Sequence, residues 1–495
     1  MAPCNVEKVL KAFMSKKTAL KSLLLLALSA SLSSCVVNPV TGEREVRVIS
    51  DRQAIDMGQQ QYGPAQQMQG GVLVADPGLQ AYVQRVGDRV AVASGVDLPY
   101  EFVVLNNTTP NAWALPGGKI AINSGLLATL QNEAELAAVL AHEVAHAAAG
   151  HGIQRYQRGL LSEGLVTIAG IGLGAAGVGG GNELMGIGRQ AAQVIGLGYS
   201  RNAERQADFY GSEFMAKAGY DPYAAVTLQE KFLALSGGAA TTGPAVWFAS
   251  HPPSAERVDN NRMRTRQLRE AGYQGGRFGQ AEYAAATRLL NSREAAYEYY
   301  DEAVVLIKEG ELDAALSRVN LALQAFDGEP RFHGLRGIIR YRQERYDDAL
   351  TNVNRAIERD PNYFQDYLVR GGIWVERGQN DRAKVDLRRS MQLLPTQDAQ
   401  RMFVALDIGE NPARYVDVNL ARTEQGPVVS VSNRAGIDLR NVLIQVEVGD
   451  SQGVRNRSVS LDRLAAGDRV QRQVGIDIPA NAQGRAYTVS AEVVR

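Results

Sequence analysis

The pattern of hydrophobic and polar positions divides the chain into three regions. From about residue 50 to 285, helical periodicity alternates with short apolar runs that are typical of strands. Small residues then recur every 34 positions up to residue 397, and beyond Tyr415 apolar and polar residues alternate singly. The pattern predicts an α+β multidomain protein with three folded units: a mainly helical mixed domain over 35–285, a helical array over 296–410 and a small β-sandwich over 414–495.

The 34-residue repeat places small residues in fixed columns. Ala315, Ala349 and Ala383 form one column, and Gly337 and Gly371 form a second. Small side chains at such positions let the two helices of each unit pack closely, and stable arrays contain about three units or more. The pattern resembles the tetratricopeptide repeat, an α-solenoid whose concave face can bind peptides.

The last eighty or so residues predict about six short strands. Glycine, asparagine, aspartate and proline clusters separate the alternating runs. No titratable cluster suggests chemistry there, so we expect a packing or binding module. The runs are Val416–Leu420, Val428–Val431, Val442–Val448, Val470–Ile478 and Tyr487–Val494.

The N-terminus has the pattern of an export signal. Basic residues precede an apolar run at 23–28, and the segment ends in Leu-Ser-Ser-Cys at Cys35. These four residues resemble a bacterial lipobox, which implies that residues 1–34 are a lipoprotein-type signal peptide and that Cys35 is lipidated. Val36 is not the aspartate that retains such lipoproteins in the inner membrane. An ordinary signal peptide followed by a chance cysteine is the alternative.

Composition excludes several classes of protein. Apolar residues make up 45% and charged residues 21% of the chain, which indicates a globular protein rather than a disordered or fibrous one. Lysine plus arginine and aspartate plus glutamate both number 53, so the chain lacks the basic excess of a nucleic-acid-binding protein. After removal of the signal, Cys35 is the one remaining cysteine, which excludes an intrachain disulfide.

The sequence His142-Glu143-Val144-Ala145-His146 is the first candidate for chemistry. Asn132 can cap a helix through this segment and, with Glu135, form a capping box. On that helix His142 and His146 lie one turn apart on one face and can bind one zinc ion. Glu143 would then be placed to take a proton from a water on the metal. A buried histidine pair without metal is the alternative.

A second helix is predicted from Ser200, and it carries two acids on one face. A catalytic zinc uses three protein ligands and keeps one open position. Glu204 is the candidate third ligand, and Asp208, four residues later, can accept the spare N–H of a ligating histidine. His151 is a rival ligand. The alternative is a pair of solvated acids on a surface helix.

Four motifs follow one another in the order of a known family. Together they resemble the gluzincin-type zinc peptidases that include HtpX, Oma and the CAAX prenyl proteases. The lipobox and the repeats point to an exported, tetratricopeptide-containing branch. The membrane-embedded members have several spanning helices that this chain lacks, and the C-terminal β unit is not part of the usual pattern. The motifs are Asn111–Gly118, the HEVAH segment with His151, Ser200–Asp208 and Ser250–Pro253.

The resemblance implies a zincin-like first domain that binds one zinc per chain through His142, His146 and Glu204. It assigns Glu143 as the catalytic base and Asp208 as an orienting carboxylate. It further implies a periplasmic metalloendopeptidase, anchored to the outer membrane by lipid only. Such an enzyme would hydrolyse unfolded or misassembled outer-membrane proteins by Glu-assisted attack of a zinc-bound water. The barrel assembly machinery is a candidate partner of the repeat array. A chaperone or assembly scaffold with a mostly closed zinc site is the alternative function.

Residues 111–114 are the candidate substrate-binding segment. They precede a Pro-Gly-Gly turn and can form an edge strand that pairs with an extended peptide. Asn111, Ala112 and Trp113 are therefore predicted to bind substrate, with core packing as the alternative for Trp113. The glycine-rich stretch 164–198 is predicted to form a mobile lid over the cleft.

His251 is a further candidate catalytic residue. It ends a stretch that begins with Gly, Ala and Thr, and Pro252-Pro253 stiffens the chain after it. The imidazole could reach the metal as a donor that stabilises the oxyanion or as a fourth ligand that displaces the water. We favour the fourth ligand, which would switch the site off. A helix-start histidine held by Ser254 and Glu256 is the alternative.

Overall fold

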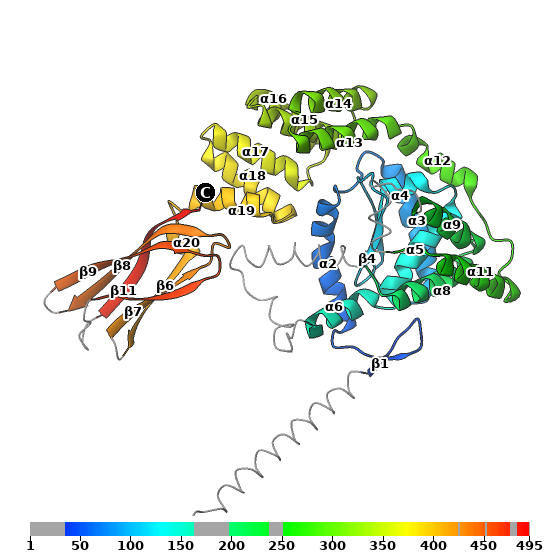
Figure 1. Cartoon of the computed structure of the whole chain (residues 1–495), viewed down its shortest axis with the longest axis horizontal. Coiled ribbons are helices and arrows are strands. Elements are labelled where there is room, and N and C mark those ends of the chain that lie inside the picture. The colour runs from blue at the N-terminus through cyan, green and yellow to red at the C-terminus, as the bar shows by residue number, and fades with distance from the viewer. Residues whose placement is uncertain are drawn as a thin grey trace, which may run out of the picture.

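A computed structural model describes most of the chain and shows three structural regions (Figure 1). The predicted signal peptide and, apart from Gly198, the predicted lid lie outside the described residues. No helix within the described part of the chain is long and apolar enough to cross a membrane. The described residues are 35–162, 198–236, 251–423, 426–450, 453–475 and 483–494.

The first region is built around a three-stranded mixed sheet with the order β3-β5-β4. β3 (Glu101–Leu105) runs parallel to β5 (Lys119–Asn123), and β4 (Ala112–Leu115) pairs antiparallel with β5, so β4 is an edge strand of this sheet. The region also contains a small antiparallel hairpin of β1 (Cys35–Val37) and β2 (Arg44–Val46). Its helices are α2 (Asp51–Met68), α3 (Pro77–Ser94), α4 (Ser124–Thr129), α5 (Glu133–Ala148), α6 (His151–Ser162), α8 (Arg201–Lys217), α9 (Tyr223–Ser236), α11 (Ala255–Glu270) and α12 (Gln280–Asn291).

Helix α5 is the central element of this region. Nearly all of its residues are buried, because α3, α8, α9 and the sheet surround it. The Asn132 side chain accepts a hydrogen bond from the Glu135 N–H, as predicted for the cap. The Glu135 carboxylate, however, accepts from the N–H of Gln131, one residue before the cap, so the box differs by one position. Gly150, with φ +69°, follows the helix and allows the chain to turn into α6.

The second region is an array of paired antiparallel helices. The helices are α13 (Glu294–Glu309), α14 (Leu312–Ala325), α15 (Pro330–Arg342), α16 (Tyr346–Arg359), α17 (Phe364–Glu376), α18 (Asn380–Leu393) and α19 (Gln397–Asp407). The column of Ala315, Ala349 and Ala383 is fully buried, which is the close packing that the repeat predicts. A Cβ on Gly337 would lie 2.5 Å from the Val353 side chain, so this position has no room for a larger residue.

The array packs directly on the first region. Arg331 of α15 donates through Nε to the Gly70 carbonyl at 2.9 Å, and the Asn106 amide donates to the buried Glu329 carboxylate at 2.8 Å. One continuous hydrophobic core joins the two regions. Figure 1 shows α13–α16 on one side of the first region and the β1 hairpin on the opposite side.

The third region consists of two three-stranded antiparallel sheets, β10-β7-β6 and β11-β8-β9, after the short helix α20 (Pro412–Tyr415). Valine, leucine and isoleucine side chains between the sheets form a separate core, which agrees with the predicted β-sandwich. The strand β9 was not among the predicted runs, because most of its side chains are exposed and polar. The strands are β6 (Val416–Thr423), β7 (Gly426–Asn433), β8 (Leu439–Asp450), β9 (Gly453–Leu464), β10 (Arg469–Gln473) and β11 (Gln483–Val493).

Candidate metal centre

Three elements bring four buried side chains to one point. His142 and His146 come from one face of α5, and Glu204 comes from the first turn of α8, whose cap is the Ser200 side chain. His251 precedes α11 and lies against the same group. Their potential ligand atoms all lie within 4.8 Å of one another. The structure thus brings together the three predicted ligands and His251, although 109 residues separate His142 from His251.

The separations between the ligand atoms fit a tetrahedral ion. His142 Nε2 lies 3.0 Å from His146 Nε2 and 3.2 Å from His251 Nδ1. Glu204 Oε1 lies 3.3 Å from His146 Nε2 and 3.0 Å from His251 Nδ1. With zinc bonds of about 2.0–2.1 Å, tetrahedral ligand atoms lie about 3.3 Å apart. Two to three imidazoles and one carboxylate are also a donor set that zinc prefers.

Glu143 lies beside this group without belonging to it. Its side chain is fully buried, and neither carboxylate oxygen has a hydrogen-bond partner among the described residues. Oε1 lies 3.6 Å from His251 Nε2. Burial raises the pKa of Glu143 above its ordinary value, against the opposing effect of the nearby histidines. A buried carboxylate without a partner is costly to fold, so a role in binding or chemistry explains it better than packing does.

Asp208 holds His142 from the side opposite the ligand atoms. Its Oδ1 lies 3.1 Å from His142 Nδ1, which leaves Nε2 directed at the candidate metal position. Burial would raise the pKa of Asp208, but the guanidinium of Arg257 outweighs burial and holds it below its ordinary value. The ionised carboxylate is therefore available to accept the histidine N–H, as the sequence pattern predicted for this pair.

Arg257 was not recognised in the sequence. It lies in the first turn of α11 and donates from Nε and Nη2 to Asp208 at 2.7 and 2.8 Å, a bidentate pair. Its Nη1 lies 3.1 Å from Glu204 Oε2 and donates to the Pro252 carbonyl at 3.1 Å. One guanidinium therefore fastens Asp208 and the candidate ligand Glu204 of α8 to the segment after His251. A basic side chain in the first turn of a helix is unfavourable because it lies at the positive end of the helix dipole. This unfavourable position, three residues after the cap Ser254, was the one sequence feature that could have indicated a special role for Arg257.

His151 contacts the centre indirectly. Its Nδ1 lies 2.9 Å from His146 Nδ1, and its Nε2 lies 3.0 Å from the Gln206 side-chain oxygen. His151 therefore forms a hydrogen bond with Nδ1 of His146, whereas Nε2 of His146 faces the candidate ligand group. His151 thus contacts a candidate ligand from the outer side and is not itself a member of the clustered group.

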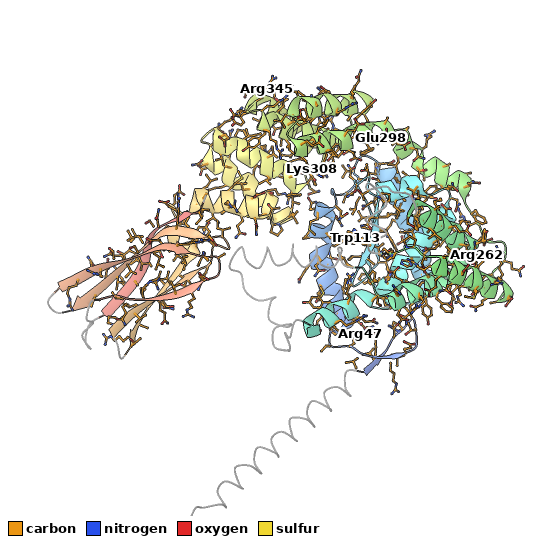
Figure 2. The ribbon with its side chains drawn as sticks, viewed as in Figure 1. Arg47, Trp113, Arg262, Glu298, Lys308 and Arg345 are labelled. Carbon is orange, nitrogen blue, oxygen red and sulfur yellow. The ribbon has the colours of Figure 1, made fainter. Side chains whose placement is uncertain are left out.

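The predicted substrate-binding residues have different environments. The side chains of Asn111 and Trp113 are buried, and Trp113 packs edge-on against Tyr62, so it belongs to the core (Figure 2). The Asn111 carbonyl accepts a hydrogen bond from the Asn123 N–H at the end of β5. The backbone groups of a strand point alternately to its two sides, so those of Ala112 and Ala114 point away from β5, toward the outer edge of the sheet. The backbone of β4, rather than its tryptophan, is what a substrate could pair with.

Tyr199 lies between the metal group and this edge. Its ring stacks on His146 with centroids 3.8 Å apart, and its hydroxyl donates to the Ala114 carbonyl at 3.3 Å. The guanidinium carbon of Arg155 lies over the same ring, 4.6 Å from its centroid. The tyrosine thus contacts both His146 and an outward-facing carbonyl of β4. No sequence motif had indicated this tyrosine.

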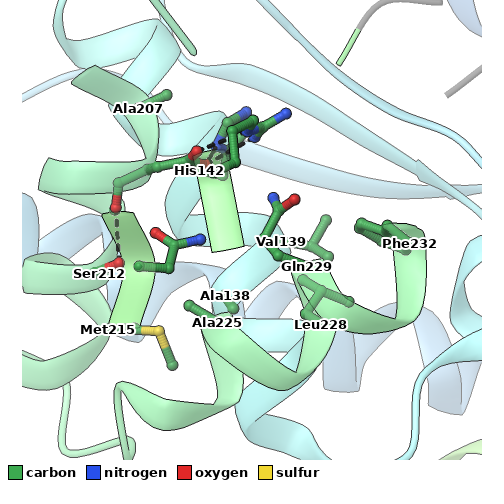
Figure 3. Close-up of a pocket in the computed structure, with 14 residues that line it drawn as sticks. Ala138, Val139, His142, Ala207, Ser212, Met215, Ala225, Leu228, Gln229 and Phe232 are labelled. Atoms are coloured by element: carbon green, nitrogen blue, oxygen red, sulfur yellow. Dashed lines mark hydrogen bonds and ion pairs between the residues drawn. The ribbon is translucent and has the colours of Figure 1, made fainter. Parts of the chain in front are cut away.

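Two cavities adjoin the centre, and they differ in size. A buried space of about 20 Å³ lies behind His142 between α5, α8, α9 and α11, and it can hold one water molecule (Figure 3). A cavity of about 290 Å³ lies on the side of His146 and Tyr199. Its walls include Ala114–Gly117 of the edge-strand segment, and apolar side chains of α2, α6 and the β1 strand. Only the larger cavity has room for a side chain of a peptide substrate.

Comparisons with known proteins agree with this geometry. The sequence profile of peptidase family M48 matches residues 77–265, and tetratricopeptide repeat profiles match residues 300–364 and 335–384. The chain is 36% identical over 183 residues to the mitochondrial metalloendopeptidase OMA1 of Schizosaccharomyces pombe (36% of this chain, 50% of the relative). It is 32% identical over 208 residues to the beta-barrel assembly-enhancing protease of Yersinia pestis, which is 40% of this chain and 41% of the relative. It is 30% identical over 179 residues to the metalloprotease YcaL of Escherichia coli, which is 36% of this chain and 67% of the relative. The chain thus spans half or less of the length of the first two relatives.

Proposed function

Because the chain belongs to peptidase family M48, we propose that it is a zinc-dependent metalloendopeptidase. The profile match confirms the family resemblance that the four motifs indicated. The observation that carries the proposal is the buried group of His142, His146, Glu204 and His251, with a carboxylate beside it, Glu143, that has no hydrogen-bond partner among the described residues. A carboxylate that only supported the fold would be expected to accept hydrogen bonds, whereas peptide hydrolysis requires a base at this position.

In this proposal His142, His146 and Glu204 hold the zinc ion. Bound zinc supplies Lewis-acid chemistry and makes hydroxide available near neutral pH. Glu143 accepts a proton from the attacking water and gives it to the leaving amine, a contribution of ~10²–10⁴-fold in comparable enzymes. Asp208 keeps the ring of His142 in one orientation, and the β4 edge aligns an extended peptide by backbone hydrogen bonds.

We further propose that the substrates are unfolded or misassembled outer-membrane proteins. Two supports exist: several relatives are named beta-barrel assembly-enhancing protease, and pairing with a β4 edge requires an extended backbone. The lipobox at Cys35 supports a periplasmic location with a lipid anchor in the outer membrane. The repeat array is the proposed contact for assembly partners. An assembly scaffold is the second candidate function, favoured by the position of His251 in the group.

Metal content is the first test of the proposal. The purified chain should hold about one zinc, and Glu204→Ala should bind it much more weakly, because the substitution removes the one carboxylate of the group and leaves only its three histidines. Elemental analysis measures the metal, and digestion of an unfolded outer-membrane barrel measures activity before and after a chelator. Glu213→Ala, on the same helix but paired with Arg264 away from the centre, is the matched control and should keep both. A metal-free wild type contradicts the assignment.

His251 supplies the second prediction. Its Nδ1 lies among the three proposed ligand atoms, so a bound ion would have four protein ligands and no open position. We therefore expect His251→Ala to cleave the unfolded barrel faster than wild type at equal zinc occupancy. The measurement is initial rate per bound zinc. A fall of tenfold or more would instead make His251 a donor to the oxyanion and exclude the switch.

A further inference from the structure

The β1–β2 hairpin exposes an unusual group of apolar side chains. Val36, Val37, Val46 and Val48 are 39%, 56%, 58% and 52% exposed, and all four lie within 13 consecutive residues. The remaining large exposed apolar side chains among the described residues are spread over the molecule. We call these four residues the valine patch. In the hairpin register Val37 and Val46 lie on one face and Val36 on the other, so apolar side chains are exposed on both faces of the hairpin. Exposed apolar side chains gathered in one short segment are typical of a contact site.

Two arginines adjoin the valine patch, and one of them, Arg47, is paired with acids. Arg47 lies between two of the valines, and its two terminal nitrogens each lie 2.6 Å from a carboxylate, of Glu45 and of Asp51. The Arg47 side chain is itself only 12% exposed, and Figure 2 places it beside α6 at the same end of the molecule as β1. Arg44, by contrast, is exposed and lies directly opposite Val37, so the patch carries a basic side chain that suits a surface containing anionic phospholipids.

The hairpin is fastened to the helices that carry the histidines. Asn38 donates to the Ala149 carbonyl at the end of α5 at 2.9 Å. The Gln157 side-chain oxygen of α6 accepts from the N–H of Val48 at 2.8 Å. Gln154 of α6 donates to Glu45 at 2.6 Å. These bonds fix the orientation of the valine patch relative to the metal centre.

The valine patch also borders the substrate cavity. Val36 and Val37 line the cavity of about 290 Å³ that reaches His146, Tyr199 and the Ala114 carbonyl. Whatever covers the patch therefore lies at an entrance to the candidate active site. The repeat helices α13–α16 lie on the opposite side of the first region and would project away from it (Figure 1).

A lipid surface is the partner that these observations favour. The hairpin begins at Cys35, the last residue of the lipobox, and Cys35 pairs directly with Val46. An acyl group on Cys35 would thus be attached next to the patch. A second apolar contact with the membrane would strengthen the binding that the lipid anchor provides. We infer that the valine patch rests on the lipid surface and holds the opening of the 290 Å³ cavity close to it. The enzyme would then prefer extended segments that are presented at the membrane. This inference rests on the proposed peptidase activity.

The test compares one peptide in two presentations. The full chain is placed in vesicles of phosphatidylethanolamine and phosphatidylglycerol with an extended peptide, either lipid-tethered or free in solution. Val46→Ser/Val48→Ser should cut the tethered peptide at least about fivefold more slowly and the free peptide at the wild-type rate. Val305→Ser/Val385→Ser is the matched control, because both valines are exposed on array helices. It should change neither rate.

A second measurement separates this inference from the proposed activity. A photo-crosslinking amino acid placed at Val48 should attach to lipid, whereas one at Val385 should not. If wild type cleaves neither peptide, the proposed activity fails and the crosslink alone decides the inference. Absence of a lipid crosslink at position 48, or an unchanged ratio of tethered to free cleavage in the Val46→Ser/Val48→Ser variant, overturns it.

Discussion

Glu143→Gln is expected to reduce peptide cleavage by at least ~10²–10⁴-fold while one zinc remains bound. The amide has the shape of the carboxylate but cannot accept the proton of the attacking water. The carboxylate oxygens are not among the four clustered ligand atoms, so zinc affinity should change little. Because both oxygens are buried without partners, the neutral amide should also leave the free energy of unfolding unchanged or slightly higher.

The same variant distinguishes the two candidate functions. Cleavage of an unfolded outer-membrane barrel, zinc content and outer-membrane assembly in cells are measured on one set of strains. Loss of both cleavage and assembly supports the peptidase, whereas loss of cleavage with normal assembly supports the scaffold. Glu135→Gln on the same helix is the control, since Glu135 pairs with Lys231 at 2.7 Å, away from the metal group. Full activity of Glu143→Gln would exclude Glu143 as the base.

Arg257→Met should weaken zinc binding by about 10–100-fold and destabilise the fold by about 3–5 kcal/mol. Methionine fills a similar volume but leaves the buried Asp208 without its cation. The pKa of Asp208 then rises toward the value that burial favours, and the carboxyl orients His142 less firmly. Zinc affinity by competition with a chelator and urea unfolding of the zinc-loaded protein measure the two effects.

Arg264→Met is the matched control for Arg257. Both arginines lie on α11 and pair with an acid on α8, but Arg264 contacts Glu213 and the face of Phe209 outside the centre. The control should bind zinc as wild type does and lose less stability, because its ion pair is partly exposed. Equal zinc affinities in the two variants would show that Arg257 only supports the fold.

Short-range patterns in the sequence determined the individual elements. The Asn132 and Ser200 caps, the one-turn spacing of His142 and His146 and the glycine after α5 are all local, because helix periodicity and capping bonds span only a few residues. The 34-residue columns likewise predicted paired helices. The family motifs added an expected third ligand at Glu204.

The tertiary structure decided how these elements meet. Arg257 reaches Asp208 across 49 residues, and His251 reaches Glu204 across 47 residues. Such contacts depend on how α8 and α11 pack around α5, and no local period encodes that packing. The same holds for Trp113, whose side chain turns into the core while the β4 backbone remains at the edge. The sequence by itself therefore determined the candidate ligands of the centre. Only the folded chain determined that Arg257 holds Asp208, that Tyr199 stacks on His146 and that His151 contacts His146 from the outer side, because these contacts arise from long-range packing.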